Sequence, residues 1–113
     1  MKGKTCFYDV EREGGDMRIS LRGEMDHHNA VAVRGEIDDL IYRERPCRVA
    51  IDLSEIGFMD SSGLGFIMGR YALLQKLGGS LVLENPNERI VKIFELAGLG
   101  RIVKIENEKK EEK

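Results

Sequence analysis

The chain has no excess of charge of one sign and no apolar run of membrane-spanning length. Its 18 lysine and arginine residues are scattered among 20 aspartate and glutamate residues, and the net charge is −2. Without a basic field, a nucleic-acid partner is not expected. The missing apolar run argues against a membrane segment, and we expect no signal peptide because no long apolar run follows residues 1–4. We therefore expect a cytoplasmic protein with no direct nucleic-acid or membrane contact.

Cysteine is scarce, and the histidines are poorly placed for a metal. Cys6 and Cys47 form no Cys-x-x-Cys pair, which favours small apolar fillers in a reducing compartment. His27 and His28 are adjacent, so they point about 100° apart at a helix start. No third ligand is evident beside them, and we expect no metal site.

A nucleotide-binding motif is also missing. Residues 62–65 (SGLG) are glycine-rich, but the Lys-Ser/Thr spacing of a P-loop is absent and no Gly-x-Gly-x-x-Gly follows a strand. Gly69 lies a full helical turn further on. We expect no cofactor and no catalytic residue. A nucleotide-binding or hydrolytic protein is the alternative from another class.

Four carboxylates fall at or near the carboxyl ends of predicted strands: Glu24, Asp26, Asp52 and Asp60. At one end of a sheet they can bind a divalent cation or orient a hydroxyl. They can equally cap helices and form a solvated rim. The residues alone leave both interpretations open.

Hydrophobic periodicity predicts eight elements in the order ββαβαβαβ. The strands are residues 5–12, 17–22, 49–53, 81–83 and 102–105, and the helices are 29–44, 62–77 and 85–97. The nearly continuous apolar run 49–53 is typical of a central strand covered on both faces. Asp26 is the predicted N-cap of the first helix, and Asn85, followed by Pro86, that of the third.

Strands joined through helices pair in parallel, and the leading hairpin adds an antiparallel pair. The predicted fold class is therefore α/β, with a mixed four- to five-stranded β-sheet and packed helices. We expect a single domain over residues 1–113, with its core at about 5–106. The charged residues 107–113 predict a disordered tail. The pattern leaves open whether one sheet face is bare.

Ser61 and Ser62 stand where the second helix begins, directly after a buried strand. The first N–H groups of a helix lack backbone partners and carry partial positive charge, so this place can hold a phosphate. One serine suffices as an N-cap, so the hydroxyl of the other serine is not needed for capping. Gly63 and Gly65 leave the first turn bare, so another protein's backbone can approach closely.

Four segments together resemble one family. They are residues 23–28 (GEMDHH), 58–65 (FMDSSGLG), 69–71 (GRY) and 96–99 (LAGL). They resemble the STAS domain family of anti-sigma factor antagonists, and the first and third favour its sporulation branch. The resemblance spans about residues 7–106. Relatives usually add a helix after the last strand, but residues 106–113 are too polar to pack as one.

The resemblance implies a partner-switching protein and not an enzyme. Such antagonists bind an anti-sigma factor that is also a serine kinase and so release a sporulation sigma factor. The kinase phosphorylates the serine after the aspartate, here Ser61, and a PP2C-type phosphatase reverses this. Ser62 is then available for the cap. A STAS module of a general stress-response, stressosome-like circuit is the alternative within the family.

We expect the partner-contact surface to comprise the start of the second helix and the turn before the first helix, because both follow strands and can converge at one sheet end. The predicted partner-binding residues are Glu24, Asp26, Asp60, Ser61, Ser62, Gly63, Leu64, Gly65 and Arg70.

Overall fold

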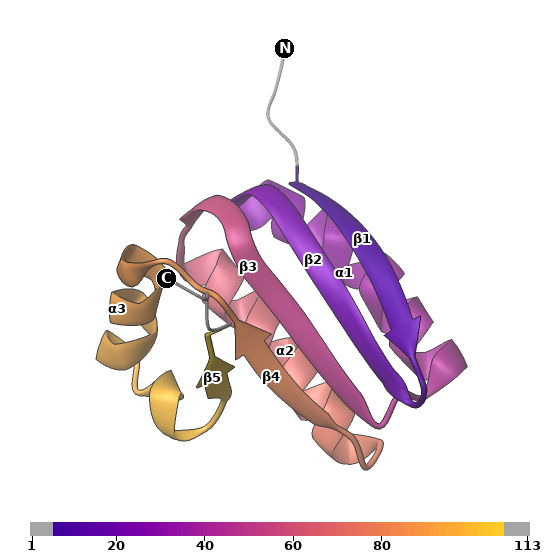
Figure 1. Cartoon of the computed structure of the whole chain (residues 1–113). Coiled ribbons are helices and arrows are strands. Elements are labelled where there is room, and N and C mark those ends of the chain that lie inside the picture. The colour runs from indigo at the N-terminus through magenta and orange to yellow at the C-terminus, as the bar shows by residue number, and fades with distance from the viewer. Residues whose placement is uncertain (1–5, 108–113) are drawn as a thin grey trace, which may run out of the picture.

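A computed structural model describes residues 6–107 of the 113-residue chain. The strands are β1 (Cys6–Glu13), β2 (Asp16–Met25), β3 (Arg48–Met59), β4 (Ser80–Glu84) and β5 (Lys104–Glu106). The helices are α1 (His27–Glu44), α2 (Ser61–Lys76), α3 (Glu88–Leu96) and the 3-10 turn η1 (Leu99–Arg101). The predicted order ββαβαβαβ and the mixed sheet are confirmed (Figure 1). Most of the tail expected at residues 107–113 lies outside the described residues.

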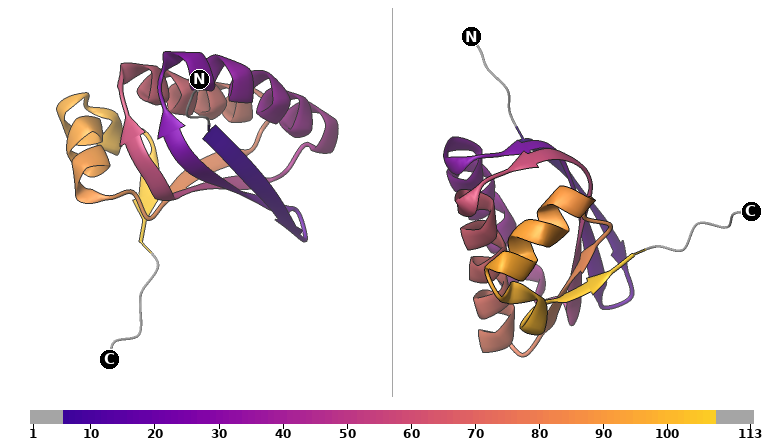
Figure 2. Two further views of the ribbon diagram at one scale, coloured as in Figure 1. Left: turned by 90° about the horizontal axis from the view of Figure 1, so that it is seen from above. Right: turned by 90° about the vertical axis from the view of Figure 1, so that its left-hand side faces the viewer.

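The five strands lie in chain order, β1-β2-β3-β4-β5. β1 pairs antiparallel with β2, and every other neighbouring pair is parallel. Figure 2 shows the helices on one side of the sheet and the other side without a helical layer. Because each helix returns the chain to the start of the next parallel strand, successive strands end at the same sheet edge.

The core lies between the sheet and the helices. In α1 the buried apolar residues recur every three or four positions, so one stripe faces the sheet. Fully buried side chains from both layers interlock there, among them Ile19, Ile37, Ile51, Ile67 and Leu83. None of the helices within residues 6–107 has the length and apolar content needed to cross a bilayer.

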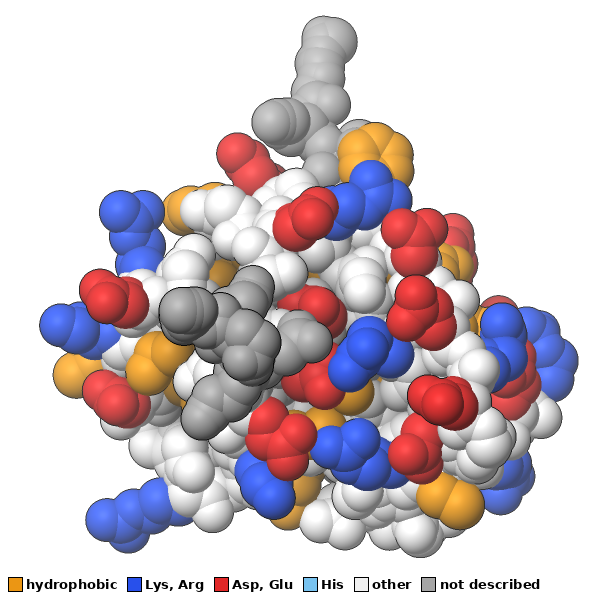
Figure 3. All heavy atoms as spheres, in the orientation of Figure 1, with side chains coloured by type: hydrophobic (Ala, Val, Ile, Leu, Met, Phe, Trp, Pro, Cys, Tyr) orange, Lys and Arg blue, Asp and Glu red, His pale blue; other side chains and the backbone are white. Residues whose placement is uncertain are grey.

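The open sheet face is covered by its own charged side chains, which corrects the expectation that the central strand is covered on both faces by other elements. Arg18 on β2 reaches over β3 to Glu84 on β4, with two hydrogen bonds of 2.9 and 3.1 Å. Arg48 on β3 reaches over β4 to Glu106 on β5 at 3.2 Å. Beneath them Ala50 stays only 3% exposed. Figure 3 shows acidic and basic groups intermixed across this face.

Several predicted boundaries are wrong. β2 continues to Met25, beyond its predicted end at residue 22. β3 continues to Met59, beyond the predicted end at residue 53, because its second half pairs with β2 and buries Ile56. β5 is shorter than predicted, because the 3-10 turn η1 ends at Arg101 and residues 102–103 still belong to the connection before the strand. The N-cap of α3 is Asn87 and not Asn85: the Asn87 side chain accepts a 2.9 Å hydrogen bond from the Ile90 N–H.

The α3 cap gives a test of this correction. Asn87→Ala removes the acceptor of the Ile90 N–H and should lower the free energy of unfolding by about 1 kcal/mol. Asn87→Ser keeps a capping oxygen and should retain most of that stability. Urea denaturation, monitored by circular dichroism, measures the free energy of unfolding of both variants. Equal stability of Asn87→Ala and the unmodified protein would contradict the assignment.

Candidate partner-binding site

Two helices begin side by side at the carboxyl end of the sheet. Met25 ends β2 and Met59 ends β3, and the two residues are paired in register. One residue later, Asp26 caps α1 and Asp60 caps α2, both with extended backbones. The Asp60 N–H also donates to the Met25 carbonyl at 3.4 Å. The register of two parallel strands therefore fixes the relative height of both helix starts.

The two aspartates satisfy backbone donors with their side chains. Oδ1 of Asp26 accepts from the Asn29 N–H at 2.9 Å, and Oδ1 of Asp60 accepts from the Ser62 N–H at 2.8 Å. The predicted cap at Asp26 is confirmed. The interpretation of Ser62 as the cap of the second helix is wrong, since Asp60 does this and Ser62 contributes the N–H donor.

This arrangement favours capping over cation binding for the predicted carboxylate group. Asp26 and Asp60 are caps, and Asp52, on β3, accepts from the Ser54 N–H at 2.8 Å. Among the described residues no group of three or more His, Cys, Asp or Glu side chains is placed to hold a metal ion. Nearby, burial and then the Asp26 charge raise the pKa of the Cys6 thiol, which keeps it protonated and unreactive at neutral pH.

The two serines differ in exposure. Ser61, the first residue of α2, is exposed, whereas Ser62 is half-buried. Neither hydroxyl makes a hydrogen bond to another residue of the described range 6–107. The first turns of α1 and α2 both lack acidic residues. The Ser61 hydroxyl therefore lies free at the positive end of a helix.

Gly63 and Gly65, both near the start of α2, have opposite surroundings. Gly65 is exposed, and a Cβ added there would meet nothing within 4 Å. Gly63 is buried, and a Cβ there would clash with Cγ of Met59 and meet Cγ of Met25 at 3.0 Å. Gly65 fits the expected close approach of a partner. Gly63 does not: it lets α2 pack on the ends of β2 and β3.

Two further residues belong to this end of the sheet, the buried Asn29 and the exposed Phe58. Neither is among the predicted contacts. Asn29 is only 6% exposed, and its Nδ2 donates to the Glu24 carbonyl at 2.8 Å, which holds the end of β2 against α1. Phe58 is paired with Glu24 across β2 and β3, and it is 45% exposed. Neither burial of an asparagine nor exposure of a phenylalanine can be read from the sequence pattern.

Arg70 is not brought to this surface. It lies further along α2, is 5% exposed and forms an ion pair with Asp38 of α1, with Nε 2.8 Å from Oδ1. Its Nη1 donates to the Phe66 carbonyl at 3.1 Å, and its guanidinium lies 5.1 Å from the centre of the Phe66 ring. Burial lowers the pKa of Arg70, although an arginine stays protonated. Arg70 thus ties α2 to α1 inside the molecule. The other eight predicted residues do converge at the sheet end.

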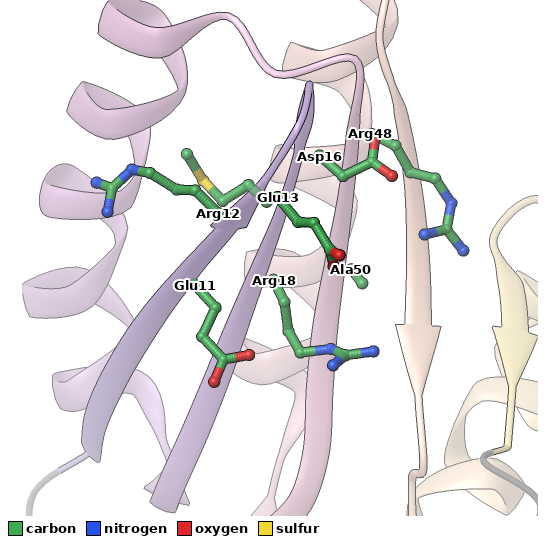
Figure 4. Close-up of a pocket in the computed structure, with 8 residues that line it drawn as sticks. Glu11, Arg12, Glu13, Asp16, Arg18, Arg48 and Ala50 are labelled. Carbon is green, nitrogen blue, oxygen red and sulfur yellow. The ribbon is translucent and has the colours of Figure 1, made fainter.

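A hollow of about 610 Å³ lies on the open sheet face at the opposite end, where β2 and β3 begin (Figure 4). Ala50 contributes to its lining, and its arginines already have carboxylate partners: Arg12 with Glu44, Arg18 with Glu84 and Arg48 with Glu106. No serine, histidine or cysteine lines it. It offers no convergent set of catalytic or ligand-binding groups, and the sheet end remains the candidate site.

Comparison with known proteins gives a consistent result. The family model for the STAS domain matches residues 8–112. The chain is similar to an anti-sigma F factor antagonist of Paenibacillus polymyxa, with 36% identity over 86% of this chain and 83% of the relative. It is also similar to an anti-sigma-B factor antagonist of Bacillus subtilis, with 35% identity over 86% of this chain and 87% of the relative.

Among solved structures, the chain resembles the anti-sigma factor antagonist SpoIIAA of Bacillus. The unphosphorylated form gives a TM-score of 0.79 at 28% identity, covering 92% of this chain and 90% of that one. The phosphorylated form gives 0.73, again at 28% identity, covering 92% and 93%.

The glycine contrast predicts opposite effects on stability. Gly63→Ala places a methyl group against Met59 and Met25 and should lower the free energy of unfolding by about 1–3 kcal/mol. Gly65→Ala adds a helix-favouring residue in open space and should raise it by about 0.5–1 kcal/mol. Urea denaturation measures both. If the two variants shift stability in the same direction, the proposed difference in packing is wrong.

The ion pair between α1 and α2 predicts a second contrast. Asp38→Ala leaves the buried Arg70 guanidinium without its carboxylate and should cost about 2 kcal/mol of unfolding free energy. Asp39→Ala, an exposed neighbour on the same helix, should change it by no more than about 0.5 kcal/mol. Thermal and urea denaturation at neutral pH measure the difference, and equal effects would rule out a structural role for the pair.

Proposed function

Because this chain belongs to the STAS domain family, among the anti-sigma factor antagonists, we propose that it is a phosphorylation-controlled partner switch. In its unphosphorylated form it binds an anti-sigma factor that is also a serine kinase, and the sigma factor is released. Phosphorylation of Ser61 by that kinase ends the interaction, and a PP2C-type phosphatase restores it. The observation that carries this proposal is the exposed Ser61 hydroxyl at a capped helix start, beside the open Gly65.

Ser61 is a better acceptor than Ser62 for a geometric reason. A kinase must reach the hydroxyl, and Ser61 is exposed whereas Ser62 is half-buried. The Ser62 N–H is bound to Asp60, so its backbone is part of the cap. The capping bond fixes the first turn of α2 while leaving the Ser61 side chain accessible. The kinase therefore meets a rigid site with one exposed hydroxyl.

The proposed contact surface consists of the residues that converge at the sheet end. We assign contacts to Glu24, Asp26, Asp60, Ser61, Ser62, Leu64 and Gly65, and a supporting role beneath them to Gly63. We assign Arg70 a positioning role, because its ion pair with Asp38 holds α2 against α1.

Phosphorylation would act by local charge and bulk. A phosphate on Ser61 adds about −1.5 to −2 charges at neutral pH. The α2 N-terminus can stabilise it by about 0.3–1 kcal/mol, while the adjacent Asp60 opposes it, so the fold itself should change little. In a complex the same phosphate must be desolvated next to Asp60, Asp26 and Glu24. A loss of about 3 kcal/mol there weakens binding more than a hundredfold.

Two regulatory circuits fit this function. Residues 23–28 (GEMDHH) and 69–71 (GRY) favour a sporulation sigma factor. The second candidate is a general stress-response circuit, supported by the 35% identity to the anti-sigma-B factor antagonist of Bacillus subtilis. Either circuit controls transcription and would place the protein in the cytoplasm.

A phosphorylation assay tests the proposal. The chain is incubated with ATP in two separate reactions. One contains the anti-sigma F factor of Paenibacillus polymyxa, and the other contains the anti-sigma-B factor of Bacillus subtilis. Mass spectrometry should find one phosphate, on Ser61. Ser61→Ala should take up none and still bind the anti-sigma factor, while Ser62→Ala should still be phosphorylated. The anti-sigma factor that acts identifies the circuit.

Three results would contradict the proposal. Loss of phosphorylation in a folded Ser62→Ala variant would show that the acceptor is Ser62, or that both serines are needed. Binding to neither anti-sigma factor would remove the antagonist function. ATP hydrolysis by the chain alone would favour the nucleotide-hydrolysing alternative.

A further inference from the structure

Phe58 is an exposed aromatic residue on the candidate surface. Its partner across the sheet is Glu24, and the next pair, Met25 with Met59, is buried against the helices. Phe58 is exposed although its neighbour Met59 is buried, and it lies two residues before the Asp60 cap. It is 45% exposed, and no ring or cation contact from residues 6–107 covers it.

The other exposed phenylalanine has a different environment. Phe7 on β1 is 56% exposed, but the Arg22 guanidinium lies 5.7 Å from its ring centre. An aromatic ring that stays uncovered beside a predicted contact surface is the usual anchor of a protein interface, because desolvating it contributes much of the binding energy. Phe58 lies two residues before the Asp60 cap, whereas Phe7 lies on the edge strand β1 and has a cation partner in Arg22.

Charged groups at the start of α3 lie near the residue that precedes Phe58. The preceding residue, Gly57, lines a shallow hollow of about 720 Å³ together with Asn87, Glu88, Arg89 and Lys92 at the start of α3. The Asn87 side chain donates to the Ile56 carbonyl at 3.4 Å, which holds this helix start against the end of β3. Within residues 6–107 neither Arg89 nor Lys92 forms an ion pair. Two cations without an ion pair among these residues, together with Glu88, therefore line a hollow that reaches the residue before Phe58.

We propose that Phe58 is the apolar anchor of the interface with the anti-sigma factor, inserted in an apolar recess whose rim carries carboxylates facing Arg89 and Lys92. This inference rests on the proposed function and extends its contact surface from α2 across the end of β3 to α3.

Three matched truncations test the anchor. Phe58→Ala should weaken binding to the anti-sigma factor at least tenfold. Phe7→Ala, on the ring covered by Arg22, and Leu96→Ala, at the far end of α3 and 84% exposed, should stay within twofold. Isothermal titration calorimetry with the anti-sigma factor that phosphorylates the chain measures all three. Thermal denaturation checks that each variant is folded.

Charge reversal tests the rim. Binding of the unmodified chain should weaken as salt rises, and the double variant Arg89→Glu, Lys92→Glu should bind more weakly and lose most of that salt dependence. Lys76→Glu, an exposed lysine at the end of α2, is the matched control and should retain it. An unchanged salt dependence in the double variant would show that the partner's rim is not acidic and would overturn that part of the proposal.

The outcomes separate this inference from the proposed function. If the unmodified chain is bound and phosphorylated but Phe58→Ala stays within twofold, the anchor is wrong and the function stands. If the unmodified chain binds neither anti-sigma factor, both fall. If Phe58→Ala changes the sedimentation of the free protein from dimer to monomer, the ring serves contact between copies of this chain, and the anchor is again wrong.

Discussion

The parallel pairing of β2 with β3 is the constraint on which the candidate site depends. Its register ends at Met25 and Met59, and each strand is followed by one aspartate and then a helix. Since the strand register is fixed by the buried residues of both strands, a shift of one position would turn every core side chain to the open face. Burial of apolar residues thus determines where Ser61 is presented.

Two internal contacts keep α2 at that height. Gly63 lets the first turn pack directly on Met59 and Met25, where a methyl group has no room. Further along, the Arg70 guanidinium binds Asp38 of α1. The first contact is apolar and the second is ionic, and both lie beneath the surface that a partner would touch. A rigid, exposed first turn lowers the cost of docking, because the ordering entropy is spent in folding and not in binding.

The open sheet face shows how charge can replace a second layer of helices. Arginines on β2 and β3 reach over neighbouring strands to glutamates on β4 and β5, and the small Ala50 lies beneath them. The long side chains bury apolar strand surface with their stems and keep their charged ends in water. This face therefore stays polar, while Phe58 at its edge remains an exposed apolar group.

Local patterns in the sequence determined the order of elements, the mixed sheet, the cap at Asp26 and the serines at a helix start, because periodicity and capping act over a few residues. Tertiary structure decided the rest. Gly63 and Arg70 changed roles because of burial and of a residue distant in sequence: Met59 and Met25 fill the space at Gly63, and Asp38 draws Arg70 inward. Ser62 changed its role for a local reason, because Asp60, two residues earlier, supplies the cap. The exposure of Phe58 could likewise not be predicted from the sequence. An aromatic residue in a strand is expected in the core until the packing of both sheet faces is known.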